Sequence, residues 1–264
     1  MSGPAEREAL NRVPDHPRWV DTRGMLLTGR AVVSFKEPAR LDRDGFVVEL
    51  ASRALLSALD NPPPPLVAER ARAMAGDVNL LVAPETAACV TTALPEWIGR
   101  PVRLHALPQP MPWESEPDDD VVIATRETAP PLDHVPEGLR HEIREALEGH
   151  PAVRFVHGTL PPRRPEDVCA SAVPVAFVLV DGRAAAFCYP VLQTERHWDV
   201  SVDTLEGYRG RRLAGRAARA MIRHMRTRGR SPVWGALESN LASLAVARRL
   251  GFVAAGSLLV FAAR

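Results

Sequence analysis

The stretch TLEGYRGRRLAGRAARAMIRHM, residues 204–225, decides how the C-terminal part of this chain folds. It follows an alternating apolar segment and passes through a turn rich in glycine and arginine. Apolar side chains then recur at intervals of four, at Leu213, Ala217, Met221 and Met225. That spacing places them on one face of a helix. The sequence therefore predicts a strand, a bare basic turn and an amphipathic helix in immediate succession.

The predicted turn is suited to binding an anion. The first amide groups of a helix have no partner within the helix, and the helix N-terminus carries a partial positive charge. Glycine lets a phosphate approach the backbone, and Gly210 and Gly215 lie in this stretch. Nine arginines and no acid occur between Arg209 and Arg230. The pattern indicates a phosphate site, although a solvated basic helix has the same letters.

The order of elements after residue 120 predicts a mixed α/β sheet. Asp181 and Gly182 join two apolar runs, which is a strong hairpin signal. The full order is strand, helix, three strands, helix, strand, helix, strand, with an antiparallel half and at least one parallel crossover. The predicted strands are 120–125, the two runs within 173–191, 197–205, 232–239 and 257–263, and the predicted helices are 136–149, 213–225 and 241–251.

A segment rich in proline and acids divides the chain. LPQPMPWESEPDDD, residues 107–120, has four prolines in all and five acids within its last seven residues, which is typical of a linker. We therefore expect an N-terminal α/β domain at 1–112 and a second domain at 113–264. In the first part, residues 46–59 have a helical spacing, and 78–83 and 100–107 are short apolar runs. No motif that carries chemistry occurs there.

Composition limits the classes of protein that fit. Of the 264 residues 46% are hydrophobic, which excludes bulk disorder, and the net charge of +1 favours neither nucleic acid nor an anionic membrane as a partner. The three cysteines are far apart and in no metal-ligand spacing, so no metal is expected. No secretion signal or transmembrane run is apparent, so we expect a cytoplasmic protein.

A second motif, SNLASLAVARRLGF at 239–252, follows a predicted strand and ends in Leu-Gly-Phe. Together with YRGRRLAG at 208–215, it resembles the GNAT superfamily of acyl-CoA-dependent N-acetyltransferases, over residues 120–264. The combination is similar to a bacterial subgroup with an extra N-terminal region. The resemblance implies a GNAT-type mixed, mostly antiparallel sheet flanked by helices, with acetyl-CoA as acyl donor. It implies a small-molecule or peptide amine as acceptor. It leaves open whether the protein forms a homodimer.

The resemblance also implies a set of cofactor-binding residues. The turn after Arg209 would receive the CoA pyrophosphate, and a bulge in the preceding strand would let main-chain groups pair with the pantetheine arm. The sheet would separate between the strands 198–204 and 232–239 to admit the thioester. The residues expected to bind the cofactor are Val202, Thr204, Leu205, Arg209, Gly210, Arg211, Arg212, Leu213, Ala214, Gly215, Asn240 and Ser243.

The chain departs from the family pattern at two positions. The central glycine of the turn motif is Arg212 here, and we expect a helical start to accommodate an arginine there. Many relatives have a tyrosine as general acid seven residues after the asparagine, and here that position is Ala247. This second departure bears on how the leaving thiolate is protonated.

An amine nucleophile must lose a proton before it attacks a thioester, so a base is expected near the strand 197–205. Glu195 is our first candidate and Asp203 the second. By strand alternation Asp199, Ser201 and Asp203 share one face, and Trp198, Val200 and Val202 share the other. The remaining candidates are His197, Asp199, Glu206 and Glu238.

Two other functions fit parts of the pattern. A domain that keeps the acyl-CoA fold as a non-catalytic sensor or interaction module would explain Ala247 and Arg212. A nucleic-acid-binding protein would use the arginine-rich helix, but the near-neutral net charge and the lack of interleaved aromatics disfavour it.

Overall fold

A computed structural model describes residues 4–36, 44–107, 110–115, 120–148 and 174–263 of the chain. The described strands form one eleven-stranded sheet in the order β1-β2-β3-β4-β11-β5-β10-β9-β8-β7-β6. The strands are β1 (Val32–Phe35), β2 (Phe46–Leu50), β3 (Leu55–Leu59), β4 (Asn79–Val82), β5 (Trp97–Ala106), β6 (Val121–Ala124), β7 (Val175–Val180), β8 (Arg183–Gln193), β9 (His197–Thr204), β10 (Ser231–Leu237) and β11 (Val253–Ala263). The helices are α1 (Pro4–Arg12), α2 (Val20–Leu27), α3 (Pro64–Ala73), α4 (Ala87–Ala93), α5 (Glu137–Glu148), α6 (Leu213–Thr227) and α7 (Leu241–Leu250).

The sheet is mixed and mainly antiparallel. Only β3 with β4 and β9 with β10 pair in parallel among the described strands. Every helix and strand predicted after residue 120 is present, and the hairpin between β7 and β8 turns at Asp181 and Gly182, which both have positive φ. The predicted fold class is therefore confirmed.

Residues 46–59 form a β-hairpin, so the predicted helix is wrong. β2 and β3 pair from Phe46 with Leu59 to Leu50 with Leu55, and Ala54 adopts a left-handed conformation in the turn. Both faces of this hairpin are covered. Phe46 packs in a cluster with α1 and α2, and Val47 packs in a cluster with α3 and α4. A strand buried on both faces gives a nearly continuous apolar run, which periodicity cannot distinguish from a buried helix.

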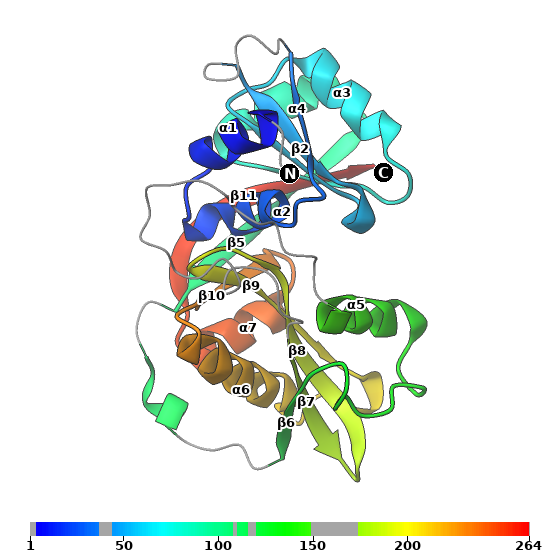
Figure 1. The fold of residues 1–264 in the computed structure, drawn as a ribbon, viewed down its shortest axis with the longest axis vertical. Coiled ribbons are helices and arrows are strands. Elements are labelled where there is room, and N and C mark those ends of the chain that lie inside the picture. Colours follow the sequence, from blue (N-terminus) through cyan, green and yellow to red (C-terminus); the bar gives the residue numbers. More distant parts are fainter. Residues whose placement is uncertain (1–3, 37–43, 108–109, 116–119, 149–173, 264) are drawn as a thin grey trace.

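The two halves of the chain repeat one order of elements. The N-terminal half, residues 4–107, contains β3, α3, β4, α4 and β5, and the C-terminal half, residues 110–263, contains β9, α6, β10, α7 and β11. The final strands are exchanged between the halves. β5 pairs with β10, and β11 pairs with β4, while β5 and β11 pair with each other. Figure 1 shows these two long strands crossing the middle of the molecule.

The exchange bears on the predicted division at residue 112. That division stays a prediction, but the hydrogen-bonded sheet does not follow it, because β5 lies between β10 and β11. Part of the predicted linker also packs on the C-terminal half. Trp113 Nε1 donates to the Leu250 carbonyl at 3.2 Å, and the Arg219 guanidinium lies 5.6 Å from the Trp113 ring centroid.

The two faces of β8 and β9 carry different helices. Trp198 and Val200 of β9 are buried with α6 and α7, as the alternation predicted. Phe187 and Tyr189 of β8 point the other way and pack in a cluster with α5. Figure 1 shows α6 and α7 on one side of these strands and α5 on the other. Asp199, Ser201 and Asp203 therefore line the face opposite α6.

Candidate active site

The sheet opens between β9 and β10. The two strands pair in parallel only from His197 with Ser231 to Asp199 with Val233. Beyond that rung β9 continues to Thr204 and β10 to Leu237 without pairing to each other. The predicted separation of these strands is thus present, and its closed end lies at Asp199. The β10-facing edge of β9 past this point has no β10 partner, so its backbone groups are open to a ligand.

The turn after β9 delivers several amides to the open end of this gap. Glu206–Tyr208 form a short 3₁₀ turn, Arg209 is extended, Gly210 has φ of 80°, and α6 begins at Leu213. A side chain added at Gly210 would meet no atom within 4 Å, and the same holds at Gly215. Both glycines therefore have open space at their Cβ positions, which favours close approach of a ligand to the backbone. The residues predicted from Val202 to Gly215 are contiguous along this path.

Arg212 has a strained backbone. Its φ of 61° and ψ of 18° are left-handed, so the expectation of a helical conformation at this position is wrong. The left-handed region favours glycine and costs other residues about 1–2 kcal/mol. The chain thus keeps the turn shape of a glycine while carrying an arginine, whose side chain is exposed. The neighbouring Arg211 lies 5.6 Å from the Tyr208 ring centroid, so Tyr208 packs ahead of the turn.

Asn240 and Ser243 begin α7 beside β10. Asn240 Oδ1 accepts a hydrogen bond from the Ser243 amide at 3.1 Å, and Ser243 Oγ accepts from Trp234 Nε1 at 2.9 Å. Both side chains thus stabilise the helix start and its contact with β10. Asn240 is exposed and Ser243 is half-buried.

The N-terminal half lacks the features of this gap. Its parallel strands β3 and β4 pair without interruption from Leu55 with Asn79 to Ala58 with Val82. The turn into its helix α3 contains the four prolines at 62–65, which have no amide hydrogen. The same order of elements therefore differs between the halves: the C-terminal half has an unpaired strand edge and a glycine-containing turn, and the N-terminal half has paired strands and a proline-rich turn.

Glu195, the first candidate base, is held in an ion pair. Arg23 of α2 donates to it through Nε at 2.8 Å and through Nη2 at 2.6 Å. The same guanidinium donates to the carbonyls of Leu10 and Val13 at 2.8 and 2.5 Å. Glu195 thus ties the turn between β8 and β9 to the N-terminal half.

Asp203, the second candidate base, lies beside α5. The Tyr189 hydroxyl donates to Glu142 at 2.7 Å and lies 3.4 Å from Asp203 Oδ2. Burial raises the pKa of Asp203, and the Glu142 carboxylate raises it further. Burial also raises the pKa of Tyr189, which stays protonated at neutral pH. Asp203 stands near the open end of the gap, four residues from its closed end.

Asp199 has the most perturbed carboxyl on this face, and sequence reasoning ranked it below Glu195 and Asp203. Burial raises the pKa of Asp199 well above its usual range, and the nearby Asp21 carboxylate raises it further. Burial raises the pKa of Asp21 from 3.8 to about 6. Asp21 lies on α2, and no local pattern in the sequence connects it with β9. Glu238, a lesser candidate, pairs with Arg103 at 2.6 Å.

Comparison with known proteins identifies the part of the chain that holds this gap. Residues 176–261 match the family model described as GNAT acetyltransferase. This part of the chain therefore resembles a GNAT acetyltransferase domain. None of the curated proteins compared with the chain matches it.

Solved GNAT-type structures share the whole architecture. A GCN5-related N-acetyltransferase-like protein from Streptococcus suis has a TM-score of 0.67 at 14% identity, with 98% of each chain covered. A protein described as a GNAT-family acetyltransferase, from Novosphingobium aromaticivorans, has a TM-score of 0.58 at 21% identity, covering 94% of this chain and 98% of that one. A GCN5-related N-acetyltransferase from Kribbella flavida has a TM-score of 0.56 at 14% identity, covering 100% and 96%. These likenesses show that the fold includes the N-terminal half.

The GNAT strand β9 is regular where a bulge was expected. Its pairing with β8 runs without interruption from Val200 with Pro190 to Thr204 with Ala186. The irregularity lies on β8, where one extra residue separates Pro190 from Gln193 opposite Val200 and Trp198. The expected bulge at residues 202–205 is therefore wrong. The opening beside β9 results from the divergence of β10 instead.

Several arginines of the GNAT helix α6 have partners within the protein. Arg216 pairs with Asp120. Arg219 stacks on Trp113, and Arg226 donates to the Leu107 carbonyl at 2.7 Å. These contacts fasten Leu107, Trp113 and Asp120 to α6. They give the basic helix a structural role that needs no nucleic acid.

Ala247 lies at the position where many GNAT proteins have a tyrosine. It is fully buried in α7 within the cluster that includes Trp234 and Phe252. A methyl group has no proton to give, so this position supplies no general acid.

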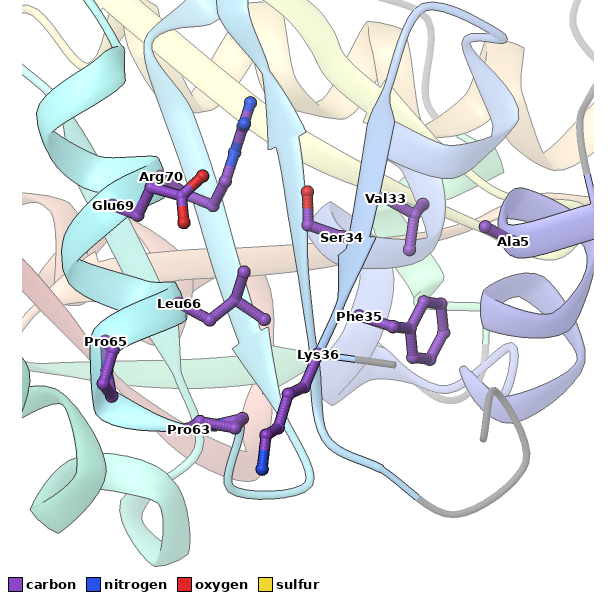
Figure 2. A pocket seen from close by; sticks show the side chains of 10 residues that line it. All are labelled: Ala5, Val33, Ser34, Phe35, Lys36, Pro63, Pro65, Leu66, Glu69 and Arg70. Atoms are coloured by element: carbon purple, nitrogen blue, oxygen red, sulfur yellow. The ribbon is translucent and has the colours of Figure 1, made fainter. Parts of the chain in front are cut away.

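A separate cavity lies at the far edge of the sheet. Its lining includes Val33, Phe35 and Lys36 of β1 and the following turn, and Leu66 and Arg70 of α3. Figure 2 shows Val33 and Phe35 on the side of Ala5, and Lys36 near Pro63. Its volume is about 530 Å³. None of the predicted site residues lines it, and β1 is separated from β10 by five strands.

Neither a metal centre nor a membrane span is found in the part of the chain that the structure describes. No cluster of three or more His, Cys, Asp or Glu side chains there has the arrangement of a metal site. No helix there has both the length and the apolar character needed to cross a bilayer.

Proposed function

We propose that the protein transfers an acetyl group from acetyl-CoA to an amine, which is a small molecule or a peptide. The observation that carries the proposal is the coincidence of two features at one end of β9. The first feature is the separation of the parallel strands β9 and β10 after Asp199. The second is the turn at 209–213, whose backbone amides precede the start of α6 at the open end of the gap.

The acyl donor fits this arrangement through its charge and its shape. Its diphosphate would accept hydrogen bonds from the amides between Gly210 and Gly215, supported by the N-terminal charge of α6. Its pantetheine arm would follow the edge of β9 that β10 leaves open. From Asp199 to Thr204 this edge extends about 17 Å, at roughly 3.3 Å per residue. The thioester would then lie near the closed end of the gap.

The reaction needs a neutral amine. For an alkylamine with a pKa of about 10.4, the neutral form costs about 4.6 kcal/mol at pH 7. A carboxylate on the Asp199 face of β9 can take the proton as the nitrogen attacks the thioester carbonyl. The C–N bond forms, the C–S bond breaks, and CoA leaves as a thiolate. Because Ala247 has no proton to give, the thiolate takes its proton from another source.

The test of the acetyl-CoA site introduces a negative charge that the N-terminus of α6 tolerates but that repels the diphosphate of acetyl-CoA. Ala214 is half-buried in the first turn of α6. Ala214→Glu places a carboxylate where a helix N-terminus tolerates it and where the diphosphate would bind. Ala214→Gln is the size-matched control. In the wild type, thermal stability should rise with acetyl-CoA concentration, by about 2.7 kcal/mol at 100 times Kd.

We expect the Glu variant to lose this acetyl-CoA-dependent stabilisation and the Gln variant to keep most of it. Equal stabilisation of both variants would show that acetyl-CoA binds elsewhere. Release of free CoA thiol in the presence of amines then tests catalysis. Because Ala247 supplies no general acid, one alternative function is a non-catalytic acyl-CoA sensor. Acetyl-CoA would stabilise such a protein, but no amine would cause release of the CoA thiol.

A further inference from the structure

The N-terminal half reaches the closed end of the gap through α2. Gly24 lies directly on β8, because a side chain there would come within 2.8 Å of Leu192 Cβ and 3.2 Å of the Gln193 amide nitrogen. Asp21 lies one turn earlier on the same face of α2. The turn between β8 and β9 is fastened to the same half, since Asp15 accepts from Thr194 Oγ1 at 2.6 Å. These contacts place α2 on β8, and Asp21 lies near enough to Asp199 of β9 to raise its pKa.

A second segment of the N-terminal half reaches the same place. Arg53, in the turn between β2 and β3, extends toward α5, and its Nη2 lies 3.4 Å from Glu145 Oε2. Its guanidinium also acts on the Asp199 carboxylate. Asp21, Arg53, Glu145 and Asp199 therefore form one cluster, which we call the inner acidic cluster. It combines α2, the β2–β3 turn, α5 and β9.

One donor in this cluster has no acceptor. The Arg53 side chain is only 9% exposed, yet its Nε has no hydrogen-bond partner among the described residues. Buried donors in native proteins nearly always have a partner, and the exceptions are often explained by a ligand or an ion. The Nε group of Arg53 is thus a buried donor that an oxygen of a bound molecule would satisfy.

The charges of the cluster are also unbalanced. The inner acidic cluster holds three carboxyl groups, Asp21, Asp199 and Glu145, and one cation, Arg53, which already pairs with Glu145. Farther along the same face stand Asp203 and Glu142, with Tyr189 between them. Burial raises the pKa values of both Asp21 and Asp199, and the Asp21 carboxylate raises the pKa of Asp199 further. A ligand with a positive charge would relieve this repulsion.

We propose that the inner acidic cluster is the acceptor site, and that it takes an amine cation with an uncharged oxygen close to the nitrogen, as in an amino alcohol or an amino sugar. Asp199, beside Asp21, receives the proton of the ammonium group, and Arg53 Nε donates to the neighbouring oxygen. This inference rests on the proposed acetyl transfer. An amino acid fits poorly, because its carboxylate would join three others that share one cation.

The proton balance of the step is simple. The ammonium group gives one proton to the carboxylate pair, and the resulting amine attacks the thioester carbonyl. The C–N bond forms as the C–S bond breaks. The second nitrogen proton goes to the CoA thiolate, directly or through water. The products are the N-acetyl compound, CoA and a protonated carboxylate pair, which returns its proton to solvent.

The position of Asp199 suits this role. It occupies the last rung of the β9–β10 pairing, next to the point where the thioester would lie, whereas Asp203 stands about 13 Å farther along the strand. Asp199 is also half-buried, so part of its surface stays exposed. The role of the N-terminal half would then be to complete the acceptor site with Asp21 and Arg53.

The experiment compares three acceptors that share one carbon skeleton: 2-amino-1-propanol, alanine and 2-aminopropane. Thiol release at saturating acetyl-CoA gives kcat/KM for each. We expect the amino alcohol to react best and alanine at least tenfold more slowly than the amino alcohol. A preference for alanine would overturn the assignment of the acceptor class. So would a wild-type protein that is stabilised by acetyl-CoA but acetylates none of the three.

Variants test the individual residues. Asp199→Asn should lower kcat/KM for the amino alcohol by about 100-fold and keep the thermal stabilisation by acetyl-CoA, which shows that it is folded. Arg53→Met should remove the preference for the amino alcohol over 2-aminopropane, a loss of about tenfold. Asp77→Asn, at an exposed aspartate of the N-terminal half, is the control and should match the wild type.

Three outcomes are distinguishable. Full activity of a folded Asp199→Asn protein would overturn the role of Asp199. An unchanged acceptor preference in Arg53→Met would overturn the role of Arg53. If acetyl-CoA does not stabilise the wild type at all, the proposed acetyl transfer itself fails, and the acceptor assignment falls with it.

Discussion

The substitution Asp21→Asn tests whether the charge of Asp21 in the inner acidic cluster lowers the free energy of unfolding. Burial raises the pKa of Asp21 from 3.8 to about 6. The unfolded chain therefore loses this proton near pH 3.8, and the folded protein keeps it until about pH 6. Between these values the unfolded state binds fewer protons, so the free energy of unfolding falls as the pH rises. Asparagine is neutral throughout and does not contribute this loss.

The magnitude follows from the two pKa values. The difference between 3.8 and about 6 corresponds to about 3 kcal/mol. Asp21 keeps part of its surface exposed, and solvent reduces the effect, so we expect about 2 kcal/mol. Asp21→Asn should thus match the wild type most closely near pH 4 and exceed it by about 2 kcal/mol above pH 6.5. The substitution also removes the repulsion of Asp199 by Asp21, which raises the free energy of unfolding of the variant as well.

Urea unfolding at pH 4.5, 5.5, 6.5 and 7.5, about one unit apart across the window set by 3.8 and 6, measures this difference. The exposed Asp77→Asn serves as the control and should follow the wild type at every pH. The reasoning is refuted if Asp21→Asn is less stable than the wild type at pH 7.5, or if the difference does not grow with pH. A variant that gains stability while losing acetyl transfer would show that the buried charge is kept for function.

Three further changes test the structure elsewhere. Arg212→Gly should raise the free energy of unfolding by about 1 kcal/mol and Tm by roughly 2–4 °C, because glycine adopts the left-handed conformation without strain; a lower Tm would contradict this. Arg23→Ala should cost roughly 2–4 kcal/mol in urea unfolding, since it strands Glu195 and frees two carbonyls; an unchanged midpoint would show that this ion pair is dispensable. A fragment of residues 113–264 lacks β5 and should lack cooperative unfolding by circular dichroism; a folded fragment that binds acetyl-CoA would instead support the division at residue 112.

The sequence was most informative where the structure depends on neighbours along the chain. The hairpin at Asp181 and Gly182, the helix α6 and the helix end at Gly251 all follow from local spacing and turn chemistry, and all are present. The turn that we propose to bind an anion also belongs to this class. Its amides are free because a strand ends and a helix begins within a few residues, which is visible in the letters alone.

Local patterns failed where burial came from distant segments. Residues 46–59 have a helical spacing, but helices on both faces of β2 and β3 bury them as a hairpin. Arg212 was expected to be helical, but the geometry of the turn holds it in the left-handed region. Glu195 was a reasonable base by its position, but Arg23, 172 residues away in sequence, holds it in an ion pair.

The sequence by itself determined the order of the C-terminal elements and the basic turn that opens α6, because hydrophobic period and backbone donors are properties of contiguous residues. Only the tertiary structure decided that the two halves exchange β5 and β11, and that Asp21, Arg53 and Asp199 meet at the closed end of the gap. Strand pairing and the burial of charge depend on which surfaces come together. Those contacts join segments more than a hundred residues apart, and no local pattern specifies them.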